Sequence, residues 1–164
     1  MIQSGDRIPS VPVKLIDTEG THDTTSDALL GTGRVVLFGV PGAFTPTCDT
    51  NHLPGFISTN AKIRAHGVSR IVCAAVNDHH VVKAWAERAE ALGKIDFLAD
   101  AHAALADELG LSKQFGELGK RYTRFAMIID NGVVQQLFVQ DVAGVTVSSA
   151  PAILLALEAN PVNA

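Results

Sequence analysis

The sequence predicts an α/β fold: a three-layer α/β/α sandwich with a central mixed sheet and a C-terminal β-hairpin. First, apolar runs of strand length alternate with stretches whose apolar residues recur at helical spacing. Second, residues 34–40 and 68–76 are almost continuously apolar, which is typical of central strands buried on both faces. Third, Asn131-Gly132 lies between the last two apolar runs, and this pair is a strong hairpin signal.

The first part of the chain is expected to form an edge strand and a short helix. Residues 11–16 form an apolar run that contains Pro12, and proline favours a sheet edge because it cannot donate to a neighbouring strand. Residues 17–20 have the composition of a turn. Residues 26–30 predict a short helix, which Gly31 would end.

The first central strand, residues 34–40, is followed by a longer helix. Apolar side chains recur at helical spacing over residues 53–63, and Gly67 marks the end of this pattern. Pro54 lies inside it and is expected to kink the helix or to remove one hydrogen bond. Residues 68–76 then supply the second central strand.

The next segment repeats the strand-then-helix order. Asn77 and Asp78 are a good capping pair for a helix whose apolar face runs over residues 81–92 and ends at Gly93. Residues 95–98 predict a short strand.

The C-terminal part combines two helices with the hairpin. Residues 103–109 predict a short helix, and residues 124–129 and 133–139 predict the two hairpin strands. Ser149 is expected to start the final helix.

Composition limits the function classes. No linker divides the chain, so residues 1–164 are expected to form a single domain. A net charge of −4 gives no basic surface for nucleic acid. No apolar run approaches the roughly 20 residues of a membrane span. The first six residues lack the pattern of a signal peptide, which favours a cytoplasmic location. Two cysteines do not make a disulfide framework and are expected to be free thiols.

The most specific motif is Pro-Gly-Ala-Phe-Thr-Pro-Thr-Cys at residues 41–48. It follows a buried strand and precedes a helix. Thr45 is a good helix cap, Pro46 fits the first helical position, and Cys48 lies in the first turn. Unpaired N–H groups and the positive end of the helix dipole favour a thiolate there. Cys48 is therefore a candidate nucleophile.

Other readings of these residues remain open at this stage. A cysteine at a helix start can be structural, and Cys73, in the middle of a predicted strand, has the setting of a small buried hydrophobe. Cys48 and His52 are spaced as a metal pair, but no further ligands cluster near them, so no metal site is expected. A cysteine hydrolase would use His52 as its base.

The chain resembles the peroxiredoxins, whose motif Pro-x-x-x-Thr/Ser-x-x-Cys stands here as Pro41, Thr45 and Cys48. The longer string through Phe56 is similar to the type 5 and plant type II branch, and so is Arg124-Phe125-Ala126-Met127. The resemblance spans nearly the whole chain and implies a thioredoxin-like fold.

The resemblance also implies a reaction. Cys48 would attack hydrogen peroxide or an organic hydroperoxide and become a sulfenic acid. Thr45 would contact the peroxide and the sulfur, Pro41 would shield the sulfur, and Arg124 would bind the peroxide oxygens and the thiolate. No metal, flavin or haem is needed, because sulfur takes up the oxidising equivalents.

Regeneration of the thiol is less fully specified. Type 5 members have a resolving cysteine before the final Ala-Pro, but residues 146–151 contain no thiol. Cys73 could resolve the Cys48 sulfenate as a disulfide, although direct attack by glutathione, glutaredoxin or thioredoxin is favoured. Phe44 and Phe115 are expected to line the pocket mouth or a subunit contact, with core packing as the alternative reading.

The resemblance further implies a homodimer formed through loops near the active site. The alternative to a peroxidase is a redox sensor, in which oxidised Cys48 signals to a partner protein without turnover. A sensor that relies on slow oxidation would not need Thr45 and Arg124 together.

Overall fold

The fold is a seven-stranded mixed sheet with helices on both faces, as expected. The computed structural model describes residues 1–140 and 144–159. The order of strands across the sheet is β2-β1-β5-β4-β3-β8-β9, and a separate two-stranded sheet pairs β6 with β7. Strands β5, β4 and β3 are parallel to one another, whereas the other pairs are antiparallel. The central mixed sheet and the C-terminal hairpin are thus confirmed.

The bounds of the elements agree with most of the expected ranges. The strands are β1 (Pro12–Asp17), β2 (Gly20–Thr25), β3 (Arg34–Val40), β4 (Val68–Ala75), β5 (Asp96–Ala99), β6 (Ser112–Gln114), β7 (Lys120–Tyr122), β8 (Phe125–Asp130) and β9 (Val133–Val139). The helices are α1 (Ser26–Leu30), α2 (Leu53–Arg64), α3 (His79–Arg88), α4 (Ala104–Leu109) and α5 (Ala150–Ala159), with a π-helical turn η1 (Cys48–His52) and a 3-10 turn η2 (Gly116–Leu118).

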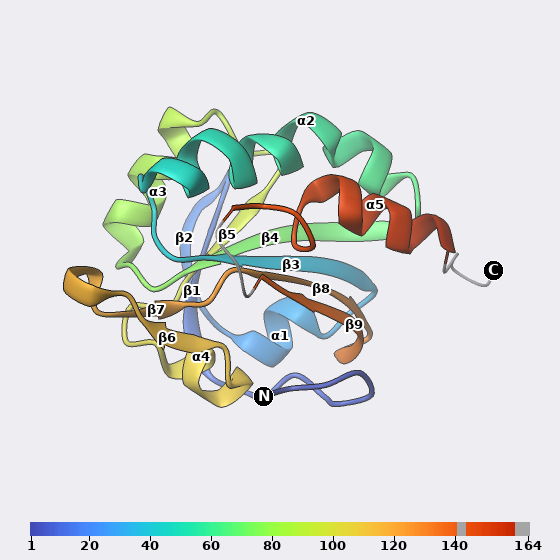
Figure 1. Ribbon diagram of the computed structural model, residues 1–164, viewed down its shortest axis with the longest axis horizontal. Coiled ribbons are helices and arrows are strands. Elements are labelled where there is room, and N and C mark those ends of the chain that lie inside the picture. The colour runs from blue at the N-terminus through green and yellow to red at the C-terminus, as the bar shows by residue number, and fades with distance from the viewer. Residues whose placement is uncertain (141–143, 160–164) are drawn as a thin grey trace.

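The sheet separates the hydrophobic core into two layers, and helices cover each of them. Figure 1 shows α2, α3 and α5 on one side of the sheet and α1 and α4 on the other. Phe38, Phe56 and Trp85 are fully buried in the first layer. Leu37 and Phe125 are fully buried in the second. Since alternate residues of β3 point to opposite layers, its almost continuous apolar run is explained.

One strand assignment needs correction. Residues 11–16 were expected to form an edge strand, but β1 pairs with both β2 and β5 and so lies inside the sheet. Pro12 is tolerated because it is the first residue of the strand. The edge strand is β2, which follows the turn at residues 18–19 and has no apolar run to predict it.

The helix expected after Cys48 has two parts, because the chain first forms the π-helical turn η1. The Leu53 N–H donates to the Cys48 carbonyl, five residues earlier, which is the bonding pattern of a π turn. Pro54, which has no N–H to donate, is at the start of α2, where the missing donor is tolerated. Pro54 therefore does not interrupt α2, and the irregular hydrogen bonding lies before it, in the π turn.

The other helix boundaries follow recognisable caps. Asp78 accepts a hydrogen bond from the Val81 N–H and caps α3, as expected. This helix ends at Arg88, five residues before Gly93, where a run to residue 92 was expected. Glu90 has a φ of 54°, a left-handed conformation that ends the helix early.

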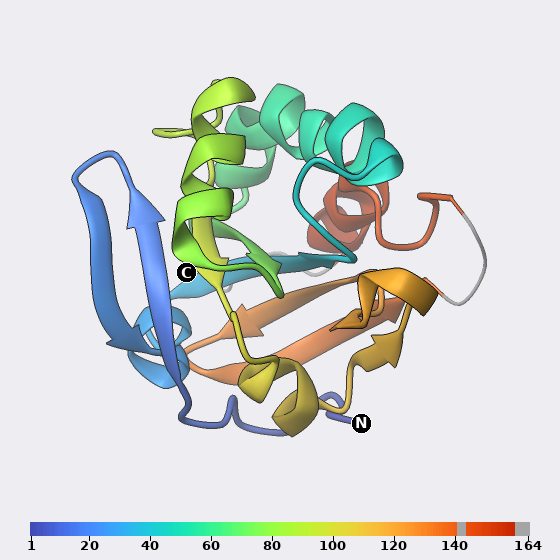
Figure 2. The ribbon, with the colours of Figure 1, turned by 90° about the vertical axis from the view of Figure 1, so that its left-hand side faces the viewer.

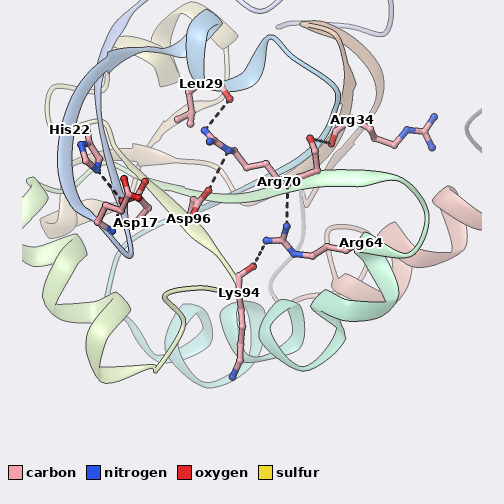
Figure 3. Close-up of polar contacts among 10 residues, drawn as sticks. Asp17, His22, Leu29, Arg34, Arg64, Arg70, Lys94 and Asp96 are labelled. Carbon is pink, nitrogen blue, oxygen red and sulfur yellow. Dashed lines mark hydrogen bonds and ion pairs between the residues drawn. The ribbon is translucent and has the colours of Figure 1, made fainter.

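A polar network lies at the edge of the sheet where the parallel strands begin (Figure 3). Arg70, near the start of β4, pairs with Asp96, the first residue of β5, at 3.3 Å. Arg64 donates to the carbonyls of Ser69 and Lys94, which ties the end of α2 to both strands. The carboxyl ends of the parallel strands, and the motif loop after β3, lie at the opposite edge, which faces the viewer in Figure 2.

Alanine substitutions at two glycines near the core are expected to change the free energy of unfolding in opposite directions. A Cβ at Gly39, in β3, would lie 2.1 Å from a ring carbon of the fully buried Phe125. Gly39→Ala is therefore expected to lower the free energy of unfolding by about 1–3 kcal/mol. A Cβ at Gly55, inside α2, would lie 3.9 Å from the Cβ of Ala150, which is an ordinary contact distance.

The matched control Gly55→Ala is expected to raise the free energy of unfolding by about 0.5–1 kcal/mol, because alanine favours helix. Urea unfolding of both variants and the parent measures these changes. A neutral Gly39→Ala variant would contradict the packing described here.

Candidate active site

The motif loop turns sharply between β3 and η1. Both the N–H and the side-chain hydroxyl of Thr45 donate to the Gly42 carbonyl, at 3.4 and 2.6 Å. Phe44, between them, has a φ of 63°, in the left-handed region that few residues other than glycine adopt. The loop therefore reverses direction within a few residues and delivers Cys48 to the start of η1.

Side chains from the β4–α3 segment fix the loop in place. The Ala43 N–H donates to Oδ1 of Asn77 at 3.0 Å. The indole Nε1 of Trp85 donates to Oδ1 of Asp49 at 2.9 Å, and Arg88 lies 3.8 Å from the other oxygen of Asp49. Because Asp49 follows Cys48 directly, α3 holds the turn that carries the thiol.

The π turn points Cys48 and His52 into the protein together. Both side chains are only 1% exposed. The rings of Phe38 and Phe56 are stacked on each other, and the His52 ring packs against both, with centroids 5.0 and 5.6 Å away. π turns occur frequently at functional sites, and this one brings a thiol and an imidazole to the same buried point.

Arg124 enters this point from the residue before β8. Its Nη2 donates to the Cys48 Sγ at 3.2 Å, and its Nη1 lies 2.9 Å from the His52 Nδ1. The Arg124 side chain is 8% exposed. A guanidinium is always charged, so it stabilises a thiolate sulfur at this distance by direct charge attraction. The structure therefore unites Cys48 with Arg124, which is 76 residues later in the chain.

The hydrogen bonds of His52 define its protonation. Its Nε2 lies 2.7 Å from the Ser148 carbonyl, which can only accept, so Nε2 carries the hydrogen. Nδ1 then accepts from Arg124. The pKa of His52 is lowered to about 3, mainly by burial and also by the charge of Arg124, against the raising effect of the Ser148 carbonyl. His52 is thus neutral, and both of its nitrogens are engaged.

This arrangement removes the hydrolase reading. A base that activates Cys48 would need a free ring nitrogen directed at the thiol. The His52 Nδ1 is occupied by Arg124 instead. Among residues 1–140 and 144–159, no group of three or more His, Cys, Asp or Glu is placed to hold a metal ion.

Thr45 and Pro41 lie on the two sides of the loop turn. The Thr45 hydroxyl was expected to cap the helix, but η1 has no side-chain cap, and the Thr45 hydroxyl donates its hydrogen to the Gly42 carbonyl. What it offers to a bound molecule is therefore its acceptor lone pairs. Pro41 directly follows β3, and its carbonyl accepts from Arg121 at 3.3 Å.

The two phenylalanines expected at the pocket mouth, Phe44 and Phe115, both lie outside the two hydrophobic core clusters. Phe44 is 38% exposed and lies beneath the Arg88 guanidinium, 5.5 Å from its ring centre, so it is not a core residue. Phe115 is partly buried next to η2, with the Lys113 ammonium 5.5 Å from its ring centre.

Cys73 is fully buried in the middle of β4. It pairs in register with Phe38 and Phe97, and neither Cys73 nor Cys48 is in a disulfide. Burial raises the pKa of the Cys73 thiol well above its usual range, the nearby Cys48 raises it further, and Arg124 opposes both. These properties match the small-hydrophobe reading of Cys73.

Several residues of the site were missed by sequence reasoning. His52 had been considered only as a metal ligand or a base, although its place four residues after Cys48 was a signal that both share a helix face. Arg121, whose Nε also donates to the Leu118 carbonyl at 3.0 Å, belongs to the unpredicted β6–β7 hairpin. Ser148 had no sequence signal, because its contact with His52 depends on the tertiary fold.

The neutral state of His52 predicts a loss of stability in acid. In the unfolded chain this imidazole titrates near 6.5, whereas in the folded protein its pKa is about 3. Between these values only the unfolded state takes up the proton, so stability falls as the pH falls from 6.5 towards 3. The expected slope is about 1.4 kcal/mol per pH unit.

His52→Gln keeps one donor and one acceptor but does not titrate, so its unfolding free energy should depend less steeply on pH in this range. His80→Gln, at an exposed position, is the matched control and should keep the parent slope. Urea unfolding between pH 4 and 7 tests this. Equal slopes for all three proteins would contradict a neutral buried His52.

Comparisons with known proteins agree with this geometry. The Redoxin family model matches residues 3–154. Peroxiredoxin-2D of Arabidopsis thaliana is 38% identical over 159 residues, which cover 95% of this chain and 98% of the relative. The chloroplastic peroxiredoxin-2E-2 of Oryza sativa is 40% identical over 164 residues, covering 95% of this chain and 72% of the relative.

Solved structures that are similar to this chain are also peroxiredoxins. Reduced Prx3 of Vibrio vulnificus, in complex with H2O2, is 42% identical, with a TM-score of 0.90 over 96% of this chain and 99% of that one. Peroxiredoxin 5 of Alvinella pompejana is 28% identical, with a TM-score of 0.85 over 98% of this chain and 100% of that one. The chain therefore belongs to the peroxiredoxins, the thiol-dependent peroxidases, in the group of the type 5 and plant type II members.

Proposed function

We propose that this peroxiredoxin reduces hydrogen peroxide and organic hydroperoxides through a sulfenic acid at Cys48. The observation that carries the proposal is the 3.2 Å contact between the Arg124 Nη2 and the Cys48 Sγ, both of them buried. In the part of the chain that the structure describes, no carboxylate forms an ion pair with Arg124. A thiolate is therefore the natural counter-charge of this guanidinium.

The chemical step needs only these groups and the substrate. The Cys48 thiolate attacks one oxygen of the peroxide, an S–O bond forms, and the O–O bond breaks. Sulfur is oxidised to the sulfenic acid, and the departing oxygen leaves as hydroxide or alkoxide, which takes up a proton from water. Arg124 stabilises the charge on that oxygen, and preorganised donors of this kind are typically worth about 3 kcal/mol.

The loop residues would orient the peroxide. The Thr45 hydroxyl, whose hydrogen is already donated to Gly42, accepts a hydrogen bond from the O–H of the substrate. Pro41 shields the sulfur from water. Phe44 and Phe115 line the mouth of the site, where the exposed ring of Phe44 offers apolar surface to the organic part of a hydroperoxide.

A one-cysteine cycle completes turnover in this proposal. A thiol from glutathione, glutaredoxin or thioredoxin attacks the sulfenic acid, releases water and forms a mixed disulfide, which a second thiol reduces. A direct role for Cys73 is disfavoured, because its fully buried thiol resists deprotonation and the attacking species is the thiolate.

The setting of the protein is part of the proposal. Residues 1–164 would form a single domain. Supporting this, strands of one sheet contribute side chains to both core layers. A homodimer through the site loops and a cytoplasmic location are also proposed. The relatives include chloroplastic peroxiredoxins of Oryza sativa and Arabidopsis thaliana. No helix in residues 1–140 or 144–159 is long and apolar enough to cross a membrane.

A redox sensor that signals through oxidised Cys48 is the alternative. The buried Arg124 contact favours the peroxidase, because it is placed to accelerate the reaction itself. Catalytic turnover separates the two: a sensor would be oxidised once without consuming excess peroxide.

Peroxide consumption with dithiothreitol as reductant tests the assignment. Cys48→Ser should abolish activity, because it removes the nucleophile. Arg124→Lys should lower the second-order rate constant for peroxide by about 100-fold, since a lysine cannot donate to the sulfur and to His52 together. Cys73→Ala, the matched control at the second cysteine, should stay within about threefold of the parent, as expected of a structural position.

The mass of the peroxide-treated protein identifies the cycle. One equivalent of peroxide should add one oxygen, and glutathione should then give an adduct at Cys48. A loss of two hydrogen atoms that requires both cysteines would instead establish a Cys48–Cys73 disulfide and overturn the one-cysteine cycle.

A further inference from the structure

Gln140, the residue after β9, organises the loop that follows it. Its side chain is 6% exposed. Oε1 accepts from the N–H of Thr146 at 2.9 Å, the N–H of Ser148 at 3.4 Å and the hydroxyl of Ser148 at 3.2 Å. Nε2 donates to Oγ1 of Thr146 at 2.8 Å. One side chain thus fixes the described part of the loop, residues 144–149, at two points.

The Ser148 carbonyl is the part of this loop that touches the active site. It accepts from the His52 Nε2 at 2.7 Å and so sets both the tautomer and the tilt of the imidazole. The His52 Nδ1 then meets Arg124, whose other terminal nitrogen contacts the Cys48 sulfur. A continuous chain of hydrogen bonds leads from Gln140 to the reacting atom.

Gln140 also contacts Arg124 through the backbone. Its N–H donates to the Arg124 carbonyl at 2.8 Å, beyond the last residue pair of β8 and β9. The main chain of Arg124 is therefore fixed by the Gln140 N–H, and its guanidinium is fixed, through Ser148 and His52, by the Gln140 amide.

We propose that Gln140 is a positioning residue for peroxide reduction, which acts through Ser148 and His52 to aim the Arg124 guanidinium at Cys48. This inference rests on the proposed roles of Cys48 and Arg124. Donor geometry in a catalytic site is demanding, and a misplacement of about 1 Å caused by a remote mutation can cost about 100-fold in rate. A loop released from Gln140 would let the imidazole tilt and the guanidinium follow it.

Isosteric variants of Gln140 test this. Gln140→Met keeps the length of the side chain but makes no hydrogen bonds, so the second-order rate constant for hydrogen peroxide should fall by about 10-fold or more. Gln140→Glu keeps oxygens that accept from all three donors and should restore the rate to within about threefold. Gln135→Met, at an exposed position of β9, is the matched control and should leave the rate unchanged.

A second variant covers the case in which Gln140→Met does not fold. Thr146→Val, at an exposed position, removes only the acceptor of the Gln140 Nε2 and should lower the rate about threefold without loss of the fold. Wild-type rates for both Thr146→Val and a folded Gln140→Met variant would overturn the proposal.

A double-mutant cycle separates positioning from a general loss of stability. If Gln140 acts through His52, the rate of Gln140→Met combined with His52→Leu should equal that of His52→Leu alone. Fully additive losses would overturn the proposal. The parent protein and Cys48→Ser are measured beside them: a parent without peroxidase turnover refutes the proposed function, whereas an active parent with unaffected Gln140 variants refutes only this inference.

Discussion

The buried charge of Arg124 is the constraint on which the rest of this structure depends. A guanidinium removed from water is costly unless its donors and its charge are matched. Here the partners are a sulfur and a neutral imidazole rather than a carboxylate. In the proposed reaction, the negative charge that completes the site comes from the Cys48 sulfur or from the departing peroxide oxygen. The fold thus supplies the positive half of an ion pair, the Arg124 guanidinium, and the proposed reaction supplies the negative half.

The residues around Arg124 keep its two partners in place. His52 has to remain neutral to accept from Arg124, and burial against the stacked rings of Phe38 and Phe56 keeps it so. The π turn η1 places thiol and imidazole on one face, and α3 secures that turn through Asp49. The polar network around Arg70 lies at the other edge of the sheet and stabilises the fold without touching the site.

Local signals made much of this predictable, and tertiary contacts account for the remainder. The strand at 34–40 was predicted from its apolar run, the hairpin from Asn131-Gly132, and the thiol at a helix start from the motif around Cys48. Strand β2 was missed because it is polar and partly exposed, and the β6–β7 hairpin because its strands have only three residues each. The roles of His52 and Gln140 were not predictable, since each depends on partners distant in sequence.

The contact between Trp85 and Asp49 has a practical consequence. The chain contains a single tryptophan, and its indole N–H is bonded to the residue next to Cys48. Any rearrangement of the turn that carries the sulfur changes the polarity around that indole. The intrinsic fluorescence of the protein is therefore a built-in optical probe of the site, which needs no label and can be followed on the time scale of a single oxidation.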